Sequence, residues 1–334
     1  MDFKKLFQLL FLLTVFSCSE TKKEKTEDNS LELTSFVRLL EYDLDNLERE
    51  IIALGDTIQY LFRHRDSILI NTDRSIYHFE NGIANSLPDA DINLSTLYIS
   101  TLAPSKQEVM DLVYLTNPLD PIFKKIFEKY EVVAQVYLNS NRQMNRLYPP
   151  FEAIDALEPD LDIPTFNFYY EADEVHNPDR KATWVREIYI DPAGRGWVVS
   201  LIYPVYVEDE LMMVLGFDIT ANDLIEIYLN NTNRNLVIID ATGTVVAGKS
   251  KGIEALSLPP LKNHTYTQTI TSDSYRVEDF NLFRSKSISV RKIASRIILS
   301  EEKKLTMKDG EDSFRLNVRK VDNIGWYVLD LIFE

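Results

Sequence analysis

The chain has few of the residues that build disulfides, metal sites and nucleic-acid interfaces. Cys18 is the only cysteine among 334 residues, so no disulfide can form within the chain. The four histidines (His64, His78, His176 and His264) are scattered, without an i, i+4 pair, and predict no metal site. Lys and Arg number 36 against 52 Asp and Glu, which gives a net charge of −16. So acidic a surface repels nucleic acid, and no nucleic-acid partner is expected.

Glycine is also scarce, at 10 residues, and no glycine-rich phosphate-binding or dinucleotide-binding pattern occurs. Residues 248–252 match Gly-x-Ser-x-Gly literally. A nucleophile elbow also needs a strand before it, a helix after it, and a histidine and an acid further on. Only His264 follows, in a threonine-rich loop, so a polar surface loop is the favoured interpretation. We therefore expect no enzymatic active site and no cofactor.

The first residues have the pattern of a secretory signal. Lys4 and Lys5 precede an apolar run over 6–16, which at roughly ten residues is too short to span a bilayer. Residues 15–18, Val-Phe-Ser-Cys, resemble the bacterial lipobox, although Phe16 is bulkier than usual there. The resemblance implies a lipoprotein signal peptide over 1–17 and lipidation of Cys18. An ordinary signal peptide with a chance cysteine is the alternative.

The segment that follows predicts a tether. Residues 19–30 contain no apolar side chain, so 18–30 is expected to be flexible. No later segment approaches the apolar length of a membrane span, which predicts an anchored protein on the periplasmic or cell-surface side. By resemblance to known lipoproteins, Ser19 rather than Asp after Cys18 favours the outer membrane.

A long helix is predicted over 31–70. Its apolar residues alternate in steps of four and three, which is a heptad seam. The seam consists of Leu33, Val37, Leu40, Leu44, Leu47, Ile51, Leu54, Ile58 and Leu61. Two interpretations stay open: a homodimer through the Leu33–Leu61 helix, or a helix lying along its own domain.

The rest of the chain predicts an α+β fold in two units, 71–230 and 231–334. In the first unit, helices are expected at 104–115, 121–130 and 221–229, a strand at 132–138, and a hairpin from 197–207 and 211–219. In the second, a hairpin is expected at 236–240 and 244–247, a turn at Asp309-Gly310, and strands at 287–299, 314–321 and 326–333. No output domain follows the last predicted strand, so a separate signalling protein is expected as a partner.

Several short patterns follow one another along the chain: Tyr148-Pro149, residues 166–172, Tyr189-Ile190-Asp191, residues 204–206, residues 215–219, residues 236–247 and Gly325-Trp326-Tyr327. In this order they resemble the double Cache (dCache) extracellular sensor domain of bacterial chemoreceptors and sensor kinases. The resemblance covers roughly residues 31–334. It implies a long helix followed by two PAS-like (Cache) units with antiparallel sheets, the first of which binds a small ligand between its sheet and its loops.

The resemblance also implies which residues contact the ligand. They are Phe166, Phe168, Tyr169, Tyr189, Tyr206 and Asp218. In amino-acid-binding members an Arg pairs with the ligand carboxylate and an Asp with its ammonium. Here Phe166 stands at the Arg position while Asp218 remains, which favours an amine or a neutral polar compound without a buried carboxylate. The alternatives are that these residues are only core, and that the protein is a structural or adhesive surface lipoprotein with a degenerate pocket.

Overall fold

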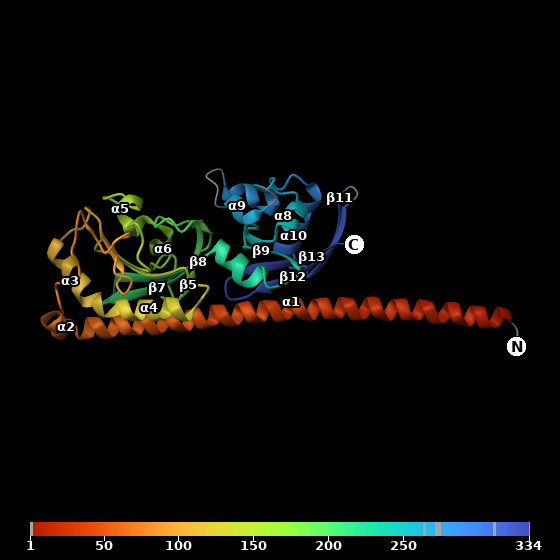
Figure 1. Cartoon of the computed structure of the whole chain (residues 1–334), viewed down its shortest axis with the longest axis horizontal. Coiled ribbons are helices and arrows are strands. Elements are labelled where there is room, and N and C mark those ends of the chain that lie inside the picture. The colour runs from red at the N-terminus through yellow and green to blue at the C-terminus, as the bar shows by residue number, and fades with distance from the viewer. Residues whose placement is uncertain (1–2, 263–264, 271–274, 310–311, 334) are drawn as a thin grey trace.

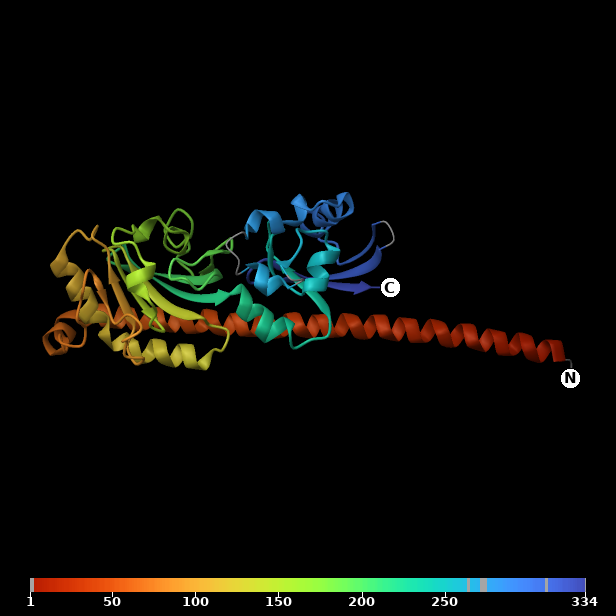
Figure 2. The ribbon, with the colours of Figure 1, turned by 45° about the horizontal axis from the view of Figure 1, so that its top comes forward.

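The computed structural model describes residues 3–262, 265–270, 275–309 and 312–333. A single long helix, α1 (Phe3–Arg63), runs beneath two units, each built on one antiparallel sheet (Figure 1). In the turned view both sheets lie above α1, while a helix of the first unit, drawn in yellow, reaches below it (Figure 2). The predicted α+β class, with a long N-terminal helix and two antiparallel sheets, is confirmed, and this is the order that the dCache resemblance implies.

The first unit is built on an eight-stranded sheet in the order β1-β2-β4-β3-β8-β7-β5, with β6 paired to β7. Its strands are β1 (Ile83–Ala84), β2 (Thr96–Ile99), β3 (Gln135–Ser140), β4 (Met144–Tyr148), β5 (Thr183–Trp184), β6 (Tyr189–Ile190), β7 (Trp197–Val207) and β8 (Glu210–Thr220). Its helices are α2 (Arg65–Asn71), α3 (Lys106–Thr116), η1 (Asn117–Leu119), α4 (Asp120–Lys129), α5 (Ala153–Ala156), η2 (Ile163–Thr165) and α6 (Asn167–Tyr170). α1 and α4 lie on one side of the sheet, and α5 and α6 lie on the other (Figure 1).

The second unit is built on a five-stranded sheet in the order β10-β9-β13-β12-β11. Its strands are β9 (Asn235–Ile239), β10 (Val245–Gly248), β11 (Lys304–Asp309), β12 (Asp312–Val321) and β13 (Trp326–Phe333). α7 (Ala221–Asp223) and η3 (Leu224–Leu229) connect the units, and α8 (Ser250–Ala255), α9 (Tyr266–Ile270), η5 (Val277–Phe280), η6 (Leu282–Arg284) and α10 (Ile288–Ile298) complete the second. The run β4-β3-β8-β7-β5 of the first sheet has the same connectivity, so the two units repeat one PAS-like strand order.

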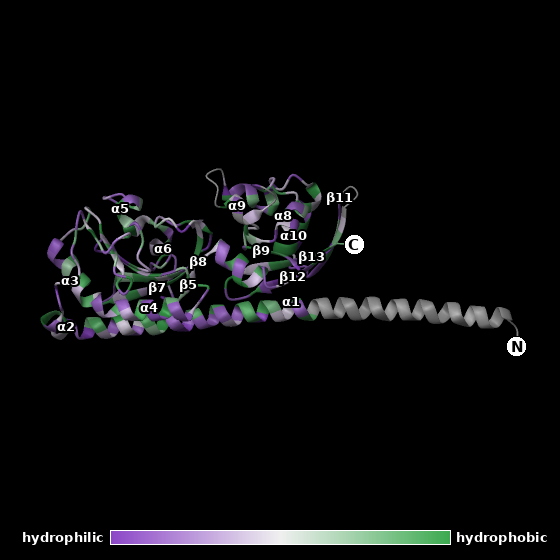
Figure 3. Cartoon of the chain, viewed as in Figure 1, coloured by the Kyte–Doolittle hydropathy of each residue, from purple (hydrophilic) through white to green (hydrophobic). Residues whose placement is uncertain are grey.

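The heptad seam of α1 is buried against the protein's own two units. Each of the nine seam residues, from Leu33 to Leu61, is at most 5% exposed. α1 contacts β7 and β8 in the first unit and β12 in the second. Hydrophobic and hydrophilic positions alternate along the coloured part of the helix in Figure 3. Of the two interpretations, packing along its own domain is therefore the one observed, and a homodimer through this helix remains a prediction that needs other residues.

Polar contacts hold α1 in place along its length. Trp184 Nε1 donates a hydrogen bond of 3.1 Å to Glu48, and Tyr228 OH donates one of 2.9 Å to Asp43. At the second unit, Asn323 Nδ2 donates one of 2.6 Å to Asp45. Because these partners come from both units, α1 joins them into one body.

Several predicted elements differ from the structure. The expected strand at 287–299 is wrong: the segment forms α10, because its apolar residues recur at helical spacing and Ser287 caps its first turn. β3 begins at Gln135, three residues later than expected. The helix predicted over 31–70 is interrupted at His64, where α1 ends and α2 follows from Arg65. The tether expected at 18–30 remains a prediction.

Two other predictions concern the ends of elements and the membrane. Gly310, of the predicted Asp309-Gly310 turn, lies outside the described residues, although β11 and β12 pair with Asp309 opposite Asp312. Among the helices that the structure describes, none is long and apolar enough to cross a membrane.

Candidate functional site

A pocket opens on the face of the first sheet that carries α5 and α6, with a cavity of about 60 Å³. By this measure one water needs about 10–15 Å³, so the cavity has the scale of a small molecule. It is lined by Tyr98, Gln135, Tyr137, Asn139, Asn145, Leu147, Phe151, Leu157, Leu161, Ile163, Phe166, Phe168, Tyr189, Asp191, Pro192, Ala193 and Asp218. None of them is a lysine, arginine or histidine, whereas two are aspartates.

The floor of the pocket follows from the alternation of a β-strand. Gln135, Tyr137 and Asn139 are every second residue of β3 and line the pocket, whereas Val136 and Leu138 between them pack in the core cluster that includes α1. Since the strand is central in the sheet, its pocket-facing side chains form the base of the cavity.

A glycine in the neighbouring strand makes room for the Tyr137 ring on the floor of the pocket. Gly216 of β8 stands opposite Tyr137 of β3. A Cβ at Gly216 would lie 1.9 Å from Cζ of Tyr137, so the aromatic ring occupies the space that a side chain would need. The Tyr137 ring can therefore lie across the sheet between the two ends of the pocket.

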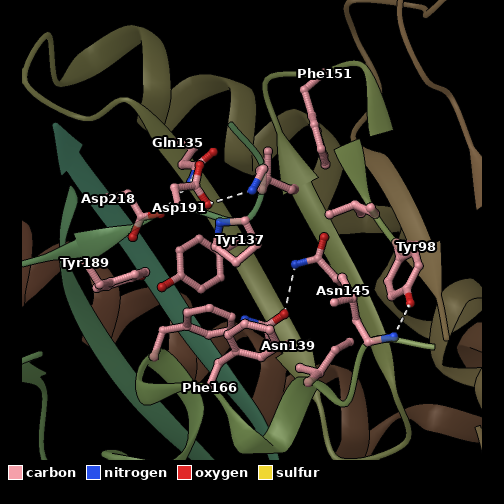
Figure 4. A pocket seen from close by; sticks show the side chains of 17 residues that line it. Tyr98, Gln135, Tyr137, Asn139, Asn145, Phe151, Phe166, Tyr189, Asp191 and Asp218 are labelled. Atoms are coloured by element: carbon pink, nitrogen blue, oxygen red, sulfur yellow. Dashed lines mark hydrogen bonds between the residues drawn. The ribbon is translucent and has the colours of Figure 1, made fainter. Parts of the chain in front are cut away.

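Two buried carboxylates meet at one end of the pocket (Figure 4). Asp218 is 1% exposed and Asp191 is 6% exposed. Nε2 of Gln135 donates to both, at 2.5 Å to Oδ2 of Asp218 and at 3.0 Å to Oδ2 of Asp191. The amide therefore bridges the two acids, while its own Oε1 is buried without a hydrogen-bond partner among the described residues.

Hydroxyl groups complete the surroundings of Asp218. Ser200 Oγ donates to Oδ1 of Asp218, and Tyr189 OH lies 2.6 Å from Ser200 Oγ, so these three residues form a chain. The buried Tyr137 hydroxyl lies beside this chain, where its interaction with Asp218 favours the charged form of that acid. Burial, followed by the charge of Asp191, raises the pKa of Asp218 to about 7. Burial also raises the pKa of Asp191, although backbone N–H groups of Ala193 and Arg195 stabilise its charged form.

Aromatic rings form the opposite wall. Phe166 and Phe168 stack with their centroids 5.1 Å apart and their planes 9° from parallel. Phe168 also contacts Tyr137 edge to face at 6.0 Å and Tyr189 at 5.9 Å. Such a wall presents π faces to which a cation is attracted.

The structure brings four of the six predicted site residues together. Phe166, Phe168, Tyr189 and Asp218 line the pocket. Tyr169 does not: it is core, and its hydroxyl donates to the backbone oxygen of Leu211 at 3.3 Å. α6 explains the difference, because a short helix there turns consecutive side chains to different sides.

Tyr206 also lies away from the pocket. The Arg180 guanidinium stands 4.0 Å over its ring, near the turn that joins β7 to β8. The stack between a cation and an aromatic face gives Tyr206 a structural role at that turn.

The sequence reasoning missed the residues that make the pocket polar. Gln135 and Asn139 were expected in or beside a strand, but no pattern marked them as pocket residues. Asp191 was part of a pattern that carried the resemblance, yet it was not chosen as a ligand contact. Its signal was present: an aspartate two residues after Tyr189 and followed by Pro192 ends a short strand with a carboxylate.

The literal Gly-x-Ser-x-Gly match stands at the end of β10 and the start of α8, and Oγ of Ser250 accepts a hydrogen bond of 3.2 Å from the backbone of Tyr266. His264, the only later histidine, lies outside the described residues. In the portion of the chain that is described, no cluster of three or more His, Cys, Asp or Glu residues could hold a metal ion.

No protein-family model and no curated protein sequence matches the chain. Among solved structures, the sensory domain of the Campylobacter jejuni chemoreceptor Tlp3 with isoleucine bound is 15% identical, with a TM-score of 0.43 over 90% of this chain and 93% of that one. The ligand-binding domain of the Pseudomonas aeruginosa amino-acid chemoreceptor PctB in complex with L-Arg is 13% identical, with a TM-score of 0.41 over 69% and 79%. The extracellular domain of the histidine kinase mmHK1S-Z2 is 14% identical, with a TM-score of 0.42 over 64% and 79%. Similarity at this level carries no argument about the ligand.

Proposed function

We propose that this protein is an extracytoplasmic small-molecule sensor whose first unit binds a compound with a protonated amine. One observation carries the proposal: two carboxylates are buried in a pocket whose lining residues include no cationic side chain. Buried charges in proteins are normally paired, because an unpaired one loses its hydration without compensation. Arg195 acts on Asp191 from outside the lining, and an ammonium group on a ligand supplies a partner inside the pocket.

The contacts follow from the geometry. Asp218 and Asp191 accept hydrogen bonds from the ammonium, and the free Oε1 of Gln135 accepts a third. The rings of Phe168 and Tyr189, with their centroids 5.9 Å apart, line the same pocket and offer π faces to the charge. Hydrogen bonds to a charged group contribute about 1.5–3 kcal/mol each, which is one to two decades in affinity.

A ligand carboxylate has no place at this end of the pocket. No arginine or lysine lines the cavity, and Phe166 stands where the dCache resemblance puts the arginine of amino-acid sensors. A carboxylate near Asp218 and Asp191 would add a third negative charge to a buried pair. The proposal is therefore an amine without an adjacent carboxylate, not an ordinary α-amino acid.

Anchoring and signalling belong to the same proposal. We propose that 1–17 is removed as a signal peptide, that Cys18 carries lipid, and that the mature protein is held at a membrane, the outer membrane being favoured. A separate signalling protein receives the ligand-bound state. The support is the lipobox-like sequence at 15–18 and the continuity of α1, which packs on both units.

The test is a thermal-shift screen of the purified full chain, since a ligand that binds only the folded state raises its stability. Primary amines should raise the melting temperature, whereas matched carboxylic acids and α-amino acids should not. Asp218→Asn keeps the shape of the side chain and should abolish the shift. Asp209→Asn removes the same charge from an exposed turn and should leave the shift unchanged. Binding of α-amino acids that is insensitive to Asp218→Asn contradicts the proposal.

A further inference from the structure

The end of the pocket opposite the acids is formed by a pair of asparagines. Asn139 of β3 and Asn145 of β4 stand directly opposite each other in the sheet. Nδ2 of Asn145 donates a hydrogen bond of 2.9 Å to Oδ1 of Asn139, and Figure 4 shows this bond at the lower part of the pocket. Both side chains line the cavity, and Asn139 is only 3% exposed.

The strand register separates this pair from the acids. Gln135 pairs with Asp218, and Asn139 follows four residues later on the same face of β3. At about 3.3 Å per residue, the two rows are roughly 13 Å apart along the strand at the level of the backbone. Tyr137 lies between Gln135 and Asn139 on the same face of β3, in the middle of that span.

The asparagine pair is a neutral site with unused hydrogen-bonding capacity. One bond between two amides uses one oxygen and one N–H group, and leaves an NH2 group and an oxygen without a partner, whichever way the two amides are turned. Among the described residues, nothing accepts from Nδ2 of Asn139, and nothing donates to Oδ1 of Asn145. Neither atom is fully buried, and both residues line the cavity, so a ligand group can meet both and use the hydrogen-bonding capacity that the pair leaves free.

We infer that the ligand carries a neutral hydrogen-bonding group, a carboxamide or a hydroxyl, at the end opposite its amine. This rests on the proposed function, which places the amine at Asp218 and Asp191. A carboxamide offers the donor for the free oxygen and the acceptor for the free NH2 group. A second ammonium or a carboxylate there would be desolvated with no opposite charge among the lining residues.

The middle of the pocket determines which kind of chain can join the amine of the ligand to its neutral group. The Tyr137 ring covers the sheet there, between Gln135 and Asn139 of β3, and the cavity as a whole is lined mostly by carbon. A short unbranched alkyl chain fits such a passage. The ligand class is therefore an ω-amino amide, or an ω-amino alcohol, of a few carbons.

The experiment compares three series with the full-length protein by isothermal titration: ω-amino amides, ω-amino acids and α,ω-diamines, each with three to six carbons. At the best chain length the amide should bind at least about tenfold more tightly than the acid or the diamine, because only the amide satisfies both asparagines. One outcome would overturn only the neutral end: the diamine or the acid binds as tightly as the amide, while Asp218→Asn abolishes binding of every amine. The proposed amine site would then stand. If no series binds, the proposed function itself fails.

Two variants test the asparagine pair directly. Asn139→Asp gives the distal end a charge and should shift preference from the amide to the diamine of equal length by about tenfold or more. Asn145→Asp makes the same change at a half-exposed position. It replaces Asn139→Asp in the titration if Asn139→Asp is too unstable to be measured. Folded variants that keep the wild-type order of the three series would overturn the assignment.

Discussion

The chemistry of the pocket depends on a proton at Asp218. Burial and the neighbouring Asp191 raise the pKa of Asp218 to about 7, so the carboxyl is half-protonated at neutral pH in the absence of ligand. Gln135 donates to both acids and lowers their mutual repulsion. A cation in the pocket stabilises the charged form, so ligand binding and proton release are linked.

Amine binding should therefore strengthen as pH rises from 6 to 8. Over this range Asp218 changes from mostly protonated to mostly ionised, which corresponds to about a tenfold gain in affinity. Titration calorimetry of one bound amine at pH 6, 7 and 8 measures it. Asp218→Glu, which keeps a carboxyl group, is the informative comparison if Asp218→Asn does not bind at all. An affinity that is flat over this range contradicts ionisation of Asp218 on binding.

The ligand-free protein should show the opposite trend in stability. The folded-state pKa of Asp218 lies above the unfolded value of about 3.9, so its contribution to stability is full below that value and is lost as pH rises through about 7. The melting temperature of wild type should therefore fall more between pH 5 and pH 8 than that of Asp218→Asn, as differential scanning fluorimetry can show. Equal slopes in the two proteins would mean that the raised pKa does not exist.

Gly216 should be required for the shape of the pocket. A Cβ there would lie 1.9 Å from Cζ of Tyr137, so the ring would have to move, and Tyr137 lines the cavity. Gly216→Ala should lower the free energy of unfolding by about 1–3 kcal/mol, as overpacking does, and it should weaken ligand binding. In the Tyr137→Ala background, Gly216→Ala should lower the free energy of unfolding much less. The double-mutant cycle, measured by urea unfolding, is contradicted if the two changes are additive.

At the residue scale, the pocket residues that stand at the ends of strands could be predicted from the sequence. Those whose orientation depends on the register of the sheet could not. Asp218 and Tyr189 stand at the ends of recognisable strands, so their place in the pocket could be predicted. Gln135 and Asn139 could not, because their exposure to the pocket depends on where β3 begins and on which strands flank it. The position of Tyr169 in the core could not be predicted, because four residues are too few to reveal the helical turn of α6.

At the scale of elements, β-branched residues misled the prediction for α10. Ile288 to Ile298 contains many isoleucines and a valine, which favour strands in isolation. Its buried residues, Val290, Ile293, Ala294 and Ile297, recur at helical spacing, so burial of one face determined the outcome. The hairpin of β7 and β8, by contrast, was predictable because both strands are long and joined by a two-residue turn.

The glycine within α1 is explained by tertiary packing. Gly55 weakens an isolated helix by about 1 kcal/mol relative to alanine, yet a Cβ there would lie 2.3 Å from Cε1 of Tyr203 on β7. Gly55→Ala should therefore destabilise the wild type by about 1–3 kcal/mol despite its better helix propensity. In Tyr203→Ala it should stabilise. Urea unfolding of the four proteins measures both signs, and stabilisation in both backgrounds would mean that the ring moves aside freely.

At the scale of the whole molecule, α1 is the element that both units share. It carries the buried seam at one end of the chain, and it continues toward Cys18, the proposed point of lipid attachment. The order of units was predictable from the sequence, because each unit has its own hairpin and terminal strands. Whether the seam packs on a second chain or on its own domain could not be predicted, because a heptad pattern is the same in both cases.

Lipid attachment should depend on the single cysteine. Cys18→Ala expressed in a bacterial host should leave the chain unprocessed or release it from the membrane fraction, because no other residue can accept the lipid. Cell fractionation with immunoblotting, together with mass spectrometry of the N-terminus, measures it. Ser17→Ala keeps a small residue before the cysteine and should be processed like wild type. A Cys18→Ala protein that stays in the membrane with a mature N-terminus contradicts the lipoprotein proposal.

The last prediction distinguishes a helix that supports its own domain from one that joins two chains. Leu44 and Ile51 are at most 1% exposed, whereas Leu39 is 55% and Ile52 is 40% exposed on the same helix. Leu44→Ala and Ile51→Ala remove contacts within one chain, so each should lower the free energy of unfolding by about 2–5 kcal/mol.

Leu39→Ala and Ile52→Ala make the same chemical changes on the outer face of α1, and each should alter stability by no more than about 0.5 kcal/mol. Urea unfolding at two protein concentrations separates the cases, because unfolding that breaks an interface depends on concentration and unfolding within one chain does not. Concentration-independent losses confined to Leu44 and Ile51 are expected. If stability instead falls on dilution, and Leu39→Ala and Ile52→Ala increase that dependence, then a second copy covers the outer face of α1, and the helix joins two sensors as well as the two units of one.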